Sequence, residues 1–350
     1  MLYLKCMLKR LEILNFTVFG EADITFSKGL NVIIGANSTG KSHLLKLGYS
    51  AMKHSRNVDL AKSASKDQSG KDLGRQLMDC FQSETIGRLG RRIQGRSKTQ
   101  IKTTFEVKDA EFDFEFSTAS QSEVKLSALP LKSIPHNPVF LPAKEVLSFF
   151  YWLPELYKEY QLPIESTYAD LCNQLGVTLK RGPGIASVSE LVETLEKIMG
   201  GKIVLENKRF YLQPRTGGGG NFEIDLVSEG FRKLGLLSYL LRNGTLSKDT
   251  ALFWDEPEAN LNNEIQKLLA EVLIQMAANG FQINIATHSL FLLKEIHILS
   301  KEKGKKVNYI NLSRDKNSTK VTVTQSDSLD MVEEIPALDA DLEQSSRFAI

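Results

Sequence analysis

The stretch GANSTGKS, residues Gly35–Ser42, constrains the fold of this chain more than any other feature. It fits the pattern G-x-x-x-x-G-K-[ST] and follows the apolar run GLNVII, which is typical of a strand. A strand, a glycine-bounded loop and a helix in this order predict a phosphate-binding loop. A glycine-rich turn that merely contains Lys41 and Ser42 is the alternative. The apolar positions at helical spacing after the loop are Leu44, Leu45, Leu47, Tyr49 and Met52.

Each residue type in this loop has a physical part in binding a nucleotide. Glycines let backbone N–H groups close around phosphate oxygens, and the N-terminus of the following helix adds partial positive charge. Lys41 can reach the β and γ phosphates, and the Ser42 hydroxyl can bind Mg²⁺. We therefore predict ATP and Mg²⁺ as cofactors. The predicted ATP contacts of the loop are Gly35, Asn37, Ser38, Thr39, Gly40, Lys41, Ser42 and His43.

A second buried strand is predicted at ALFWDE, where four apolar residues are followed by Asp255 and Glu256. Open α/β sheets bind ligands at the carboxyl ends of their strands. Because phosphoryl transfer depends on positioning and charge stabilisation, Asp255 would hold Mg²⁺ through water and Glu256 would orient the attacking water. The alternative is that both acids cap the next helix, with Pro257 at its first position.

His288 follows a third apolar strand, INIAT, and would therefore reach the same edge of the sheet. A single histidine after an apolar strand is more often a packed structural residue. Its order after the loop and the acidic strand makes it a candidate catalytic residue, together with Lys41 and Glu256.

Other elements follow from local patterns. ADITF and GLNVII flank Ser27-Lys28-Gly29, which predicts a β-hairpin, and residues 53–96 are polar and basic, which indicates mobile helices. KTTFEVKDAEFDFEFS alternates as exposed antiparallel strands do, and a buried strand is expected to end at Pro142. Residues 145–200 are expected to be helical.

The C-terminal half shows a regular alternation. KIVLENKRFYLQP and NFEIDLV predict a hairpin around Gly217 to Gly220. From Phe231 onward helices and strands alternate, which is typical of a parallel α/β sheet.

The stretch VSEGFRKLG precedes the acidic strand, and by itself Ser228 is an ordinary helix N-cap. The loop at Gly35, then Ser228, then Asp255-Glu256, then His288 together resemble the ATP-binding cassette (ABC) superfamily. In that family the segment before the acidic strand is the signature motif, and its helix N-terminus faces the γ-phosphate held by the other subunit. The resemblance implies ATP contacts in trans from Ser228, Glu229 and Gly230. It also implies that Glu258 to Asn262 form the D-loop at the dimer interface, with Asn260 at the nucleotide.

Within the superfamily the chain resembles the soluble branch of SMC, Rad50, RecF and OLD ATPases. LVSEGFRKLGLLSYLLRNGTL, ALFWDEPEANLNN, VFLPAKEVLSF and ALDADLEQSSRF resemble the compact AAA-type ATPases of bacterial anti-phage systems such as PARIS, where a separate TOPRIM effector is the partner. The resemblance implies an α/β fold: an ABC-ATPase head with a P-loop parallel sheet core, an antiparallel β subdomain and a helical subdomain.

The chain is accordingly divided, within one ATPase unit, into six segments. They are 1–52 (N-terminal β-hairpin, P-loop and first helix), 53–100 (basic helical insertion), 101–144 (β subdomain and core strand), 145–226 (helical subdomain with a β-hairpin), 227–300 (signature, Walker B, D-loop and H-loop core) and 301–350 (C-terminal strand and helix).

The chain departs from the family pattern at several positions. Ser38 stands where many relatives have Gly, and Glu229 stands where transporters have a second Gly. The second departure disfavours the nucleotide subunit of a transporter, as does the long central insertion. No glutamine occupies the Q-loop place, so Lys144 or Glu145 would contact metal or water instead.

The aromatic residue that would stack on adenine is not assigned. Phe16 and Phe19 are candidates, with packing in the core as their alternative role.

Spacing and composition exclude other classes. About 185 residues separate Ser42 from Ser228, too few for the coiled-coil arms of SMC or Rad50, and about 60 residues follow His288, too few for a TOPRIM nuclease. Three cysteines without a C-x-x-C pair fit a reducing cytoplasm, which is the expected location. The apolar run near Val146 to Leu153 is far shorter than the roughly 20 residues that span a bilayer, so no membrane contact is expected.

A basic run, RLGRRIQGRSKTQIK, could neutralise several phosphates of a nucleic acid. It lacks interleaved aromatic residues for stacking bases, so a solvated loop or a surface for an acidic protein is an equal alternative. The net charge of +2 does not itself demand nucleic acid. The candidate nucleic-acid contacts are Arg88, Arg91, Arg92, Arg96 and Lys98.

Two hypotheses of function follow. The first is an ATPase that forms a homodimer or higher homo-oligomer around ATP and controls a separately encoded effector in anti-phage defence. The second is a RecF-like DNA-binding ATP clamp for repair or replication.

Overall fold

The computed structural model describes residues 7–57, 65–92, 97–160, 162–178, 186–216, 220–314, 320–332 and 335–348. Their strands are β1 (Leu8–Phe16), β2 (Phe19–Thr25), β3 (Leu30–Gly35), β4 (Lys98–Phe105), β5 (Phe112–Ser117), β6 (Lys125–Leu126), β7 (Val139–Leu141), β8 (Gly201–Glu206), β9 (Arg209–Pro214), β10 (Phe222–Glu223), β11 (Ala251–Asp255), β12 (Gln282–Ala286), β13 (Val307–Arg314) and β14 (Val321–Ser326). Their α-helices are α1 (Lys41–Asn57), α2 (Lys66–Phe81), α3 (Leu153–Glu159), α4 (Ser166–Leu175), α5 (Ala186–Met199), α6 (Glu229–Arg242), α7 (Asn263–Ala278), α8 (Leu290–Glu302) and α9 (Pro336–Phe348).

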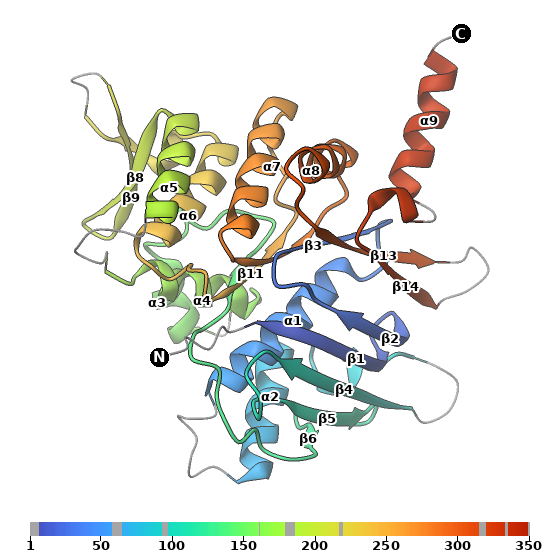
Figure 1. Cartoon of the computed structure of the whole chain (residues 1–350). Helices are drawn as coiled ribbons and strands as arrows, with labels where there is room; N and C mark the ends of the chain where they lie inside the picture. Colours follow the sequence, from blue (N-terminus) through green and yellow to red (C-terminus); the bar gives the residue numbers. More distant parts are fainter. Residues whose placement is uncertain are drawn as a thin grey trace.

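An 11-stranded sheet runs through the molecule in the order β6-β5-β4-β1-β2-β14-β13-β3-β12-β11-β7 (Figure 1). The pairs β13–β3, β3–β12, β12–β11 and β11–β7 are parallel, as the alternation of helices and strands predicts. A separate 3-stranded sheet, β10-β9-β8, lies with α5 and α6 beside the parallel end of the large sheet.

The parallel strands are buried on both faces. Leu30, Val32 and Ile34 of β3 belong to the hydrophobic cluster that also contains residues of α7 and α8. Ile33 belongs to the other cluster, with residues of α1. Because side chains alternate along a strand, a continuous apolar run such as LNVII fills two cores at once. The prediction of buried strands at β3, β11 and β12 is confirmed.

The antiparallel part of the sheet, β2-β1-β4-β5-β6, is buried on one face only. Phe112, Phe114 and Phe116 of β5 pack into the cluster beneath α1 and α2. On the opposite face Lys98 of β4 pairs with Glu115 of β5. The predicted antiparallel strands are therefore present, and they are half-buried.

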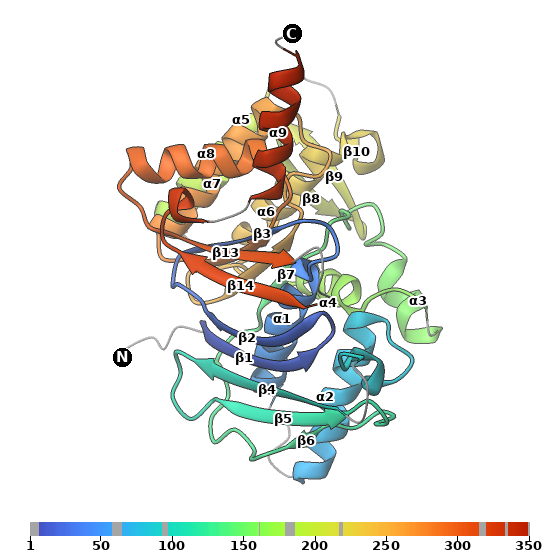
Figure 2. The same ribbon diagram turned by 90° about the vertical axis from the view of Figure 1, so that its right-hand side faces the viewer.

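The predicted hairpin at Ser27-Lys28-Gly29 is wrong. β2 and β3 are consecutive in the chain, but β14 and β13 lie between them in the sheet (Figure 2). The Asn31 side chain holds the connecting turn: its Oδ1 accepts from the Ser27 N–H at 2.7 Å, and its Nδ2 donates to the Ser27 carbonyl at 3.1 Å. The turn is thus stabilised without backbone pairing of the two strands.

Two further predictions need correction. KIVLENKRFYLQP forms two strands, β8 and β9, joined at Asn207 and Lys208, whose φ angles of 49° and 63° suit a tight hairpin turn. The predicted pairing of this segment with NFEIDLV is confirmed, since β10 pairs antiparallel with β9, and residues 217–219 of the predicted turn lie outside the described residues. The C-terminal segment contains two strands, β13 and β14, where one was expected.

Buried amides line the amino ends of the parallel strands. Asn31 of β3 donates from Nδ2 to Asn284 Oδ1 of β12 at 3.0 Å and accepts at Oδ1 from Asn308 Nδ2 of β13 at 2.9 Å. Asn284 in turn donates to the Leu252 carbonyl of β11 at 3.1 Å. Asn31 and Asn284 are fully buried. This asparagine ladder joins four neighbouring strands by side chains as well as by backbone.

Helix α4 is tied to α1, the helix that follows the glycine-rich loop. The Tyr49 hydroxyl of α1 donates to Asp170 Oδ2 of α4 at 2.9 Å, and Lys53 pairs with the same carboxylate. Lys46 of α1 pairs with Glu165, the N-cap residue of α4. The helical part therefore has a fixed position relative to α1. Among the described helices, none has the length and apolar character needed to cross a membrane.

Candidate functional site

The glycine-rich loop connects β3 to α1 at the carboxyl end of the parallel strands. Gly35 has φ +151°, and a Cβ there would lie 2.4 Å from the Leu312 carbonyl of β13. Gly40 has φ +94°, and its Cβ would lie 2.6 Å from Val18 Cγ2. Both positions therefore require glycine. Ser38 adopts φ 63°, a left-handed conformation that serine tolerates at a cost.

Lys41, the first residue of α1, folds back over this loop. Its ammonium donates to the carbonyls of Gly35 at 2.8 Å and Ala36 at 3.0 Å. Burial lowers the pKa of Lys41, and the nearby carboxylates, with Asp255 the strongest, oppose that shift. The ring of His43 packs against Phe81 of α2 with ring centroids 5.6 Å apart, and burial lowers its pKa to about 4. The imidazole ring thus packs against α2, and the ATP contact of His43 stays a prediction.

Ser42 and Asp255 lie next to each other across the β3–α1 connection and the end of β11. Burial raises the pKa of Asp255 to about 6, and a hydrogen bond from Ser42 partly offsets that rise. Mg²⁺ in nucleotide sites is usually held by one or two protein oxygens together with phosphates and water. A serine hydroxyl beside a carboxylate fits that ligand set. The described residues contain no cluster of three or more His, Cys, Asp or Glu side chains able to hold a metal alone.

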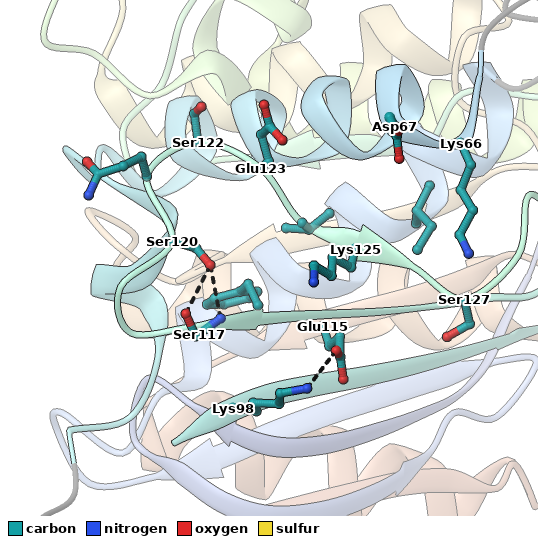
Figure 3. A pocket seen from close by; sticks show the side chains of 14 residues that line it. Lys66, Asp67, Lys98, Glu115, Ser117, Ser120, Ser122, Glu123, Lys125 and Ser127 are labelled. Carbon is teal, nitrogen blue, oxygen red and sulfur yellow. Dashed lines mark hydrogen bonds and ion pairs between the residues drawn. The ribbon is translucent and has the colours of Figure 1, made fainter. Parts of the chain in front are cut away.

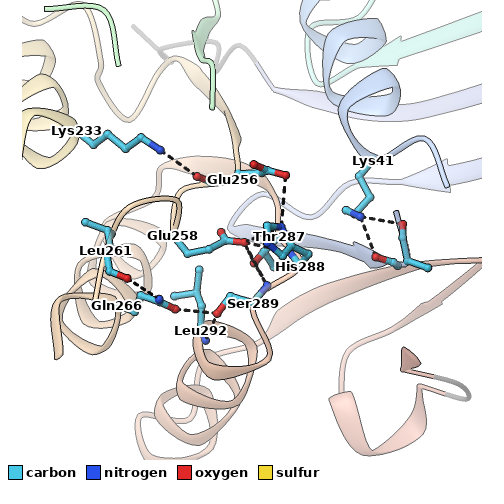
Figure 4. Close-up of polar contacts among 12 residues, drawn as sticks. Lys41, Lys233, Glu256, Glu258, Leu261, Gln266, Thr287, His288, Ser289 and Leu292 are labelled. Atoms are coloured by element: carbon cyan, nitrogen blue, oxygen red, sulfur yellow. Dashed lines mark hydrogen bonds and ion pairs between the residues drawn. The ribbon is translucent and has the colours of Figure 1, made fainter. Parts of the chain in front are cut away.

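Glu256 and His288 face each other at the same edge of the sheet. His288 Nδ1 lies 3.4 Å from Glu256 Oε1 (Figure 4). Glu256 has φ +46°, and its N–H donates to the Ala286 carbonyl of β12 at 2.9 Å. Both side chains are accessible, with exposures of 39% for Glu256 and 52% for His288. This pair can therefore meet a water molecule or a phosphate at the mouth of the sheet.

Glu258 fixes the loop that carries His288. Its Oε1 accepts from Thr287 Oγ1 at 2.7 Å and from the N–H groups of His288 at 3.0 Å and Ser289 at 3.2 Å (Figure 4). The Glu258 side chain is only 5% exposed. A buried carboxylate that accepts three hydrogen bonds at a helix N-terminus is a strong anchor. The interpretation of Glu258 to Asn262 as a D-loop did not predict this anchor.

Ser228 caps α6. Its Oγ accepts from the Phe231 N–H at 3.4 Å, so the N-cap interpretation of this stretch holds within one subunit. A Cβ on Gly230 would lie 2.6 Å from Leu261 Cδ2 and 2.9 Å from the Asn260 carbonyl. The first turn of α6 therefore packs directly against the segment that follows β11. Asn260 has φ 64° and an exposed side chain.

Lys233 lies one turn further along α6, and the sequence did not identify it as a candidate site residue. Its side chain is 2% exposed, and its Nζ donates to the Glu256 carbonyl at 3.4 Å. Burial lowers its pKa, and Glu229 leads the acids that raise it. The only sequence signal is a lysine beside the apolar run LGLLSYLL, which is weak because lysines commonly flank such runs.

Glu145, a candidate for the Q-loop contact to metal or water, is bound by other side chains of the protein. Glu145 is 4% exposed, and its Oε1 lies 3.3 Å from Arg232 Nε of α6. Ser148 donates its hydroxyl to the same carboxylate. Phe16 and Phe19 are fully buried, which supports their alternative role in the core.

A hollow of about 240 Å³ lies at the loop. It is lined by Gly35, Ala36 and Asn37 on one side and by Thr287, His288 and Ser289 on the other. A larger hollow of about 970 Å³ lies elsewhere, between α2 and the edge strands β5 and β6 (Figure 3). Lysines and acids alternate around it, so it has no preference for an anion. The smaller hollow borders the loop and His288, but Ile34, Leu290, Leu293 and Ile335 also line it, so part of its wall is apolar.

The basic run is partly neutralised by acids of the same chain. Arg88 pairs with Glu84, and Lys98 pairs with Glu115. Arg91 and Arg92 lie in the described part of the chain, whereas Arg96 lies outside it. The described cations of this run therefore carry less net charge toward a partner than the sequence alone indicates.

Comparison with known proteins agrees with this architecture. Residues 187–294 match the family described as "AAA domain, putative AbiEii toxin, Type IV TA system". The structure is similar to an SMC head solved with the C-terminal winged-helix domain of ScpA (TM-score 0.52, 16% identity, 93% of this chain and 99% of that chain). It is also similar to an SMC head with an extended coiled coil bound to the C-terminal domain of ScpA derived from Pyrococcus furiosus (TM-score 0.54, 13% identity, 98% and 100%). A search of the curated proteins gives no significant match.

These similarities confirm the predicted fold. The chain has the mixed α/β fold of these SMC heads, and the loop at Gly35 follows β3 at the carboxyl end of the parallel strands. The roles of individual residues toward ATP, Mg²⁺ and catalysis, and the six segment boundaries, stay predictions.

Proposed function

We propose that this protein is an ATPase that pairs with a second copy of itself around ATP and Mg²⁺. The observation that carries the proposal is the distance of 3.4 Å between His288 Nδ1 and Glu256 Oε1. Both residues follow parallel strands at the carboxyl edge of the sheet, the same edge at which the loop before Lys41 lies. A carboxylate and an imidazole at the end of adjacent strands suit the orientation of a water for attack on a γ-phosphate.

Each residue has a role in this proposal. The loop N–H groups and Lys41 bind the phosphates, while Ser42 and Asp255 hold the Mg²⁺ that balances phosphate charge. Glu256 accepts a hydrogen bond from the attacking water, and His288 orients Glu256 or contacts the γ-phosphate. Ser228, Glu229 and Gly230 face the ATP of the partner copy, where the N-terminus of α6 favours negative charge.

We further propose that the nucleotide state controls a separately encoded effector, a TOPRIM-type nuclease being one class, in anti-phage defence in the cytoplasm. The matching family description and the resemblance of ALFWDEPEANLNN to compact defence ATPases support this role. The pairing of Arg88 with Glu84 and of Lys98 with Glu115 reduces the positive charge that the basic run offers to DNA, which favours this role over the RecF-like clamp.

The test is Glu256→Gln, with Glu264→Gln on the exposed first turn of α7 as the matched control. Glu256→Gln should bind ATP as the wild type does, lose at least about 100-fold in turnover and accumulate as an ATP-bound oligomer. Glu264→Gln should behave as the wild type. Unchanged hydrolysis in Glu256→Gln would remove that residue from its role.

The partner is tested with the same variant. Glu256→Gln protein is isolated from its native host with ATP and Mg²⁺, and bound material is identified by mass spectrometry and nuclease digestion. A second protein in fixed ratio supports the effector hypothesis. DNA without a protein partner would contradict it and support the clamp.

A further inference from the structure

Lys233 is placed where the surrounding packing favours an apolar side chain. Its neighbours on α6 include Leu234, Leu236 and Leu237, which are 3% exposed or less. Removing an ammonium group from water costs free energy that a leucine at the same position would not require. The lysine therefore needs an explanation other than packing.

The contacts of Lys233 supply one. Its Nζ donates to the main-chain carbonyl of Glu256 at 3.4 Å (Figure 4). The charges of Glu229, Glu258, Glu256 and Asp255 raise its pKa and so oppose the effect of burial. Figure 4 shows the Lys233 ammonium directed at Glu256, whereas the Lys41 ammonium bonds to carbonyls of its own loop. Lys233 thus belongs to α6 but acts on the end of β11.

Glu256 depends on such support because its backbone is strained. A non-glycine residue in the left-handed region is disfavoured, because its Cβ crowds the following carbonyl oxygen. Three contacts hold the backbone at φ +46°. The Glu256 N–H donates to the Ala286 carbonyl at 2.9 Å, and the Glu256 carbonyl accepts from the Ala259 N–H at 3.1 Å and from Lys233 Nζ at 3.4 Å. Lys233 is the only one of the three donors and acceptors that comes from α6. The direction of the Glu256 carboxylate toward His288 follows from this backbone conformation.

Helix α6 meets this segment at a second point. The first turn of α6 packs at Gly230 against Asn260 and Leu261, too closely for a Cβ. Ser228 begins the same helix. A displacement of the Ser228 cap therefore moves both the 256–261 segment and the ammonium that holds Glu256.

We propose that Lys233 is a positioning residue that couples ATP held by the partner at Ser228 to the orientation of Glu256 in its own subunit. The two ATP molecules of a dimer would then be hydrolysed cooperatively, because each site is completed only when the neighbouring site is filled. This inference rests on the proposed function.

The test compares Lys233→Met, which keeps the length of the chain without its donor, with Lys233→Gln, which keeps a neutral donor. Lys267→Met, at an exposed lysine of α7, is the matched control. For each protein we would measure nucleotide affinity of the monomer, ATP-dependent association, turnover at saturating ATP and the Hill coefficient for ATP.

Lys233→Met should bind ATP and associate within about twofold of the wild type, because Lys233 contacts neither nucleotide nor partner in the proposed dimer. Its turnover should fall on the order of 10- to 100-fold, the size expected for a misdirected catalytic group, and its Hill coefficient should fall from near two toward one. Lys233→Gln should lie between Lys233→Met and the wild type, and Lys267→Met should match the wild type.

Two outcomes overturn the inference. If both Lys233 variants are folded and retain the wild-type turnover and Hill coefficient, Lys233 has a packing role only. If the wild type neither associates with ATP nor hydrolyses it, the proposed function fails and the inference with it. Should Lys233→Met not fold, the comparison of Lys233→Gln with the wild type decides by the same criteria.

Discussion

Polar side chains at the two ends of the parallel strands differ in burial and in hydrogen bonding. At the amino ends Asn31 and Asn284 are fully buried, and each has hydrogen-bond partners on neighbouring strands. At the carboxyl ends Ser38, Glu256 and Asn260 have left-handed backbones, and the Glu256 side chain is accessible. The same strands thus carry a satisfied network at one end and a strained, accessible one at the other. Satisfied amides stabilise one arrangement, whereas accessible charged groups can exchange partners for a ligand.

The largest effect is expected from Lys41→Met at the carboxyl end. Turnover should fall on the order of 1,000-fold, because charge stabilisation of the γ-phosphate is lost. The free energy of unfolding should change by less than about 1 kcal/mol. The substitution removes two hydrogen bonds to carbonyls, which is destabilising, but it also removes a partly desolvated ammonium, which is stabilising. Steady-state hydrolysis and denaturant unfolding measure the two quantities. A large loss of stability with normal turnover would show that Lys41 stabilises the fold and does not act in hydrolysis.

Asn31→Leu at the amino end should have the opposite profile. It leaves Asn284 Oδ1, Asn308 Nδ2 and the Ser27 N–H without their Asn31 partners. The free energy of unfolding should fall by about 3 kcal/mol, since buried polar groups without partners are costly. ATP affinity of the folded protein should stay within about twofold of the wild type, as measured by nucleotide titration. Weakened ATP binding at unchanged stability would show that the two ends are not separate.

Substitutions of Ser228 separate its cap role from its proposed role toward the partner. Ser228→Ala should lower stability by about 1 kcal/mol, because an N-cap acceptor is lost. Ser228→Asp keeps a cap acceptor, so stability should be preserved. Its negative charge would face the phosphates of the partner's ATP and should weaken ATP-dependent association roughly tenfold. Analytical ultracentrifugation with and without ATP measures this, and normal association of Ser228→Asp would leave only the cap role.

The smallest effect is expected at Ser38. Ser38→Gly removes a side chain from a left-handed position and should raise the free energy of unfolding by about 0.5 kcal/mol, because the relieved strain exceeds the added entropy of the unfolded chain. Turnover should be unchanged. Thermal denaturation resolves the shift, and a loss of stability would indicate that the Ser38 side chain makes a contact worth more than its strain.

The comparison also explains what the sequence could predict. Gly35 to Ser42 and the strand ending at Asp255 are short local patterns, and their secondary structure is confirmed. β2 pairs with the adjacent strand β1 on one side, but its second partner, β14, and the partner β13 of β3 were not predictable because they lie about 300 positions away, as Val321 beside Phe19 shows. Lys233 was missed for the same reason: its partner, Glu256, lies on a different element.

The central position of the C-terminal hairpin has a consequence for how the protein is made. β13 and β14 join the N-terminal strands β1 and β2 to β3, and Leu312 of β13 lies directly behind Gly35. While the ribosome has not yet released residues 307–326, β2 and β3 each present an unpaired edge, which is an aggregation hazard in any nascent chain. During that time the glycine-rich loop also lacks its packing contact with β13. We therefore expect the phosphate-binding loop to reach its final packing late in translation, after β13 has joined β3.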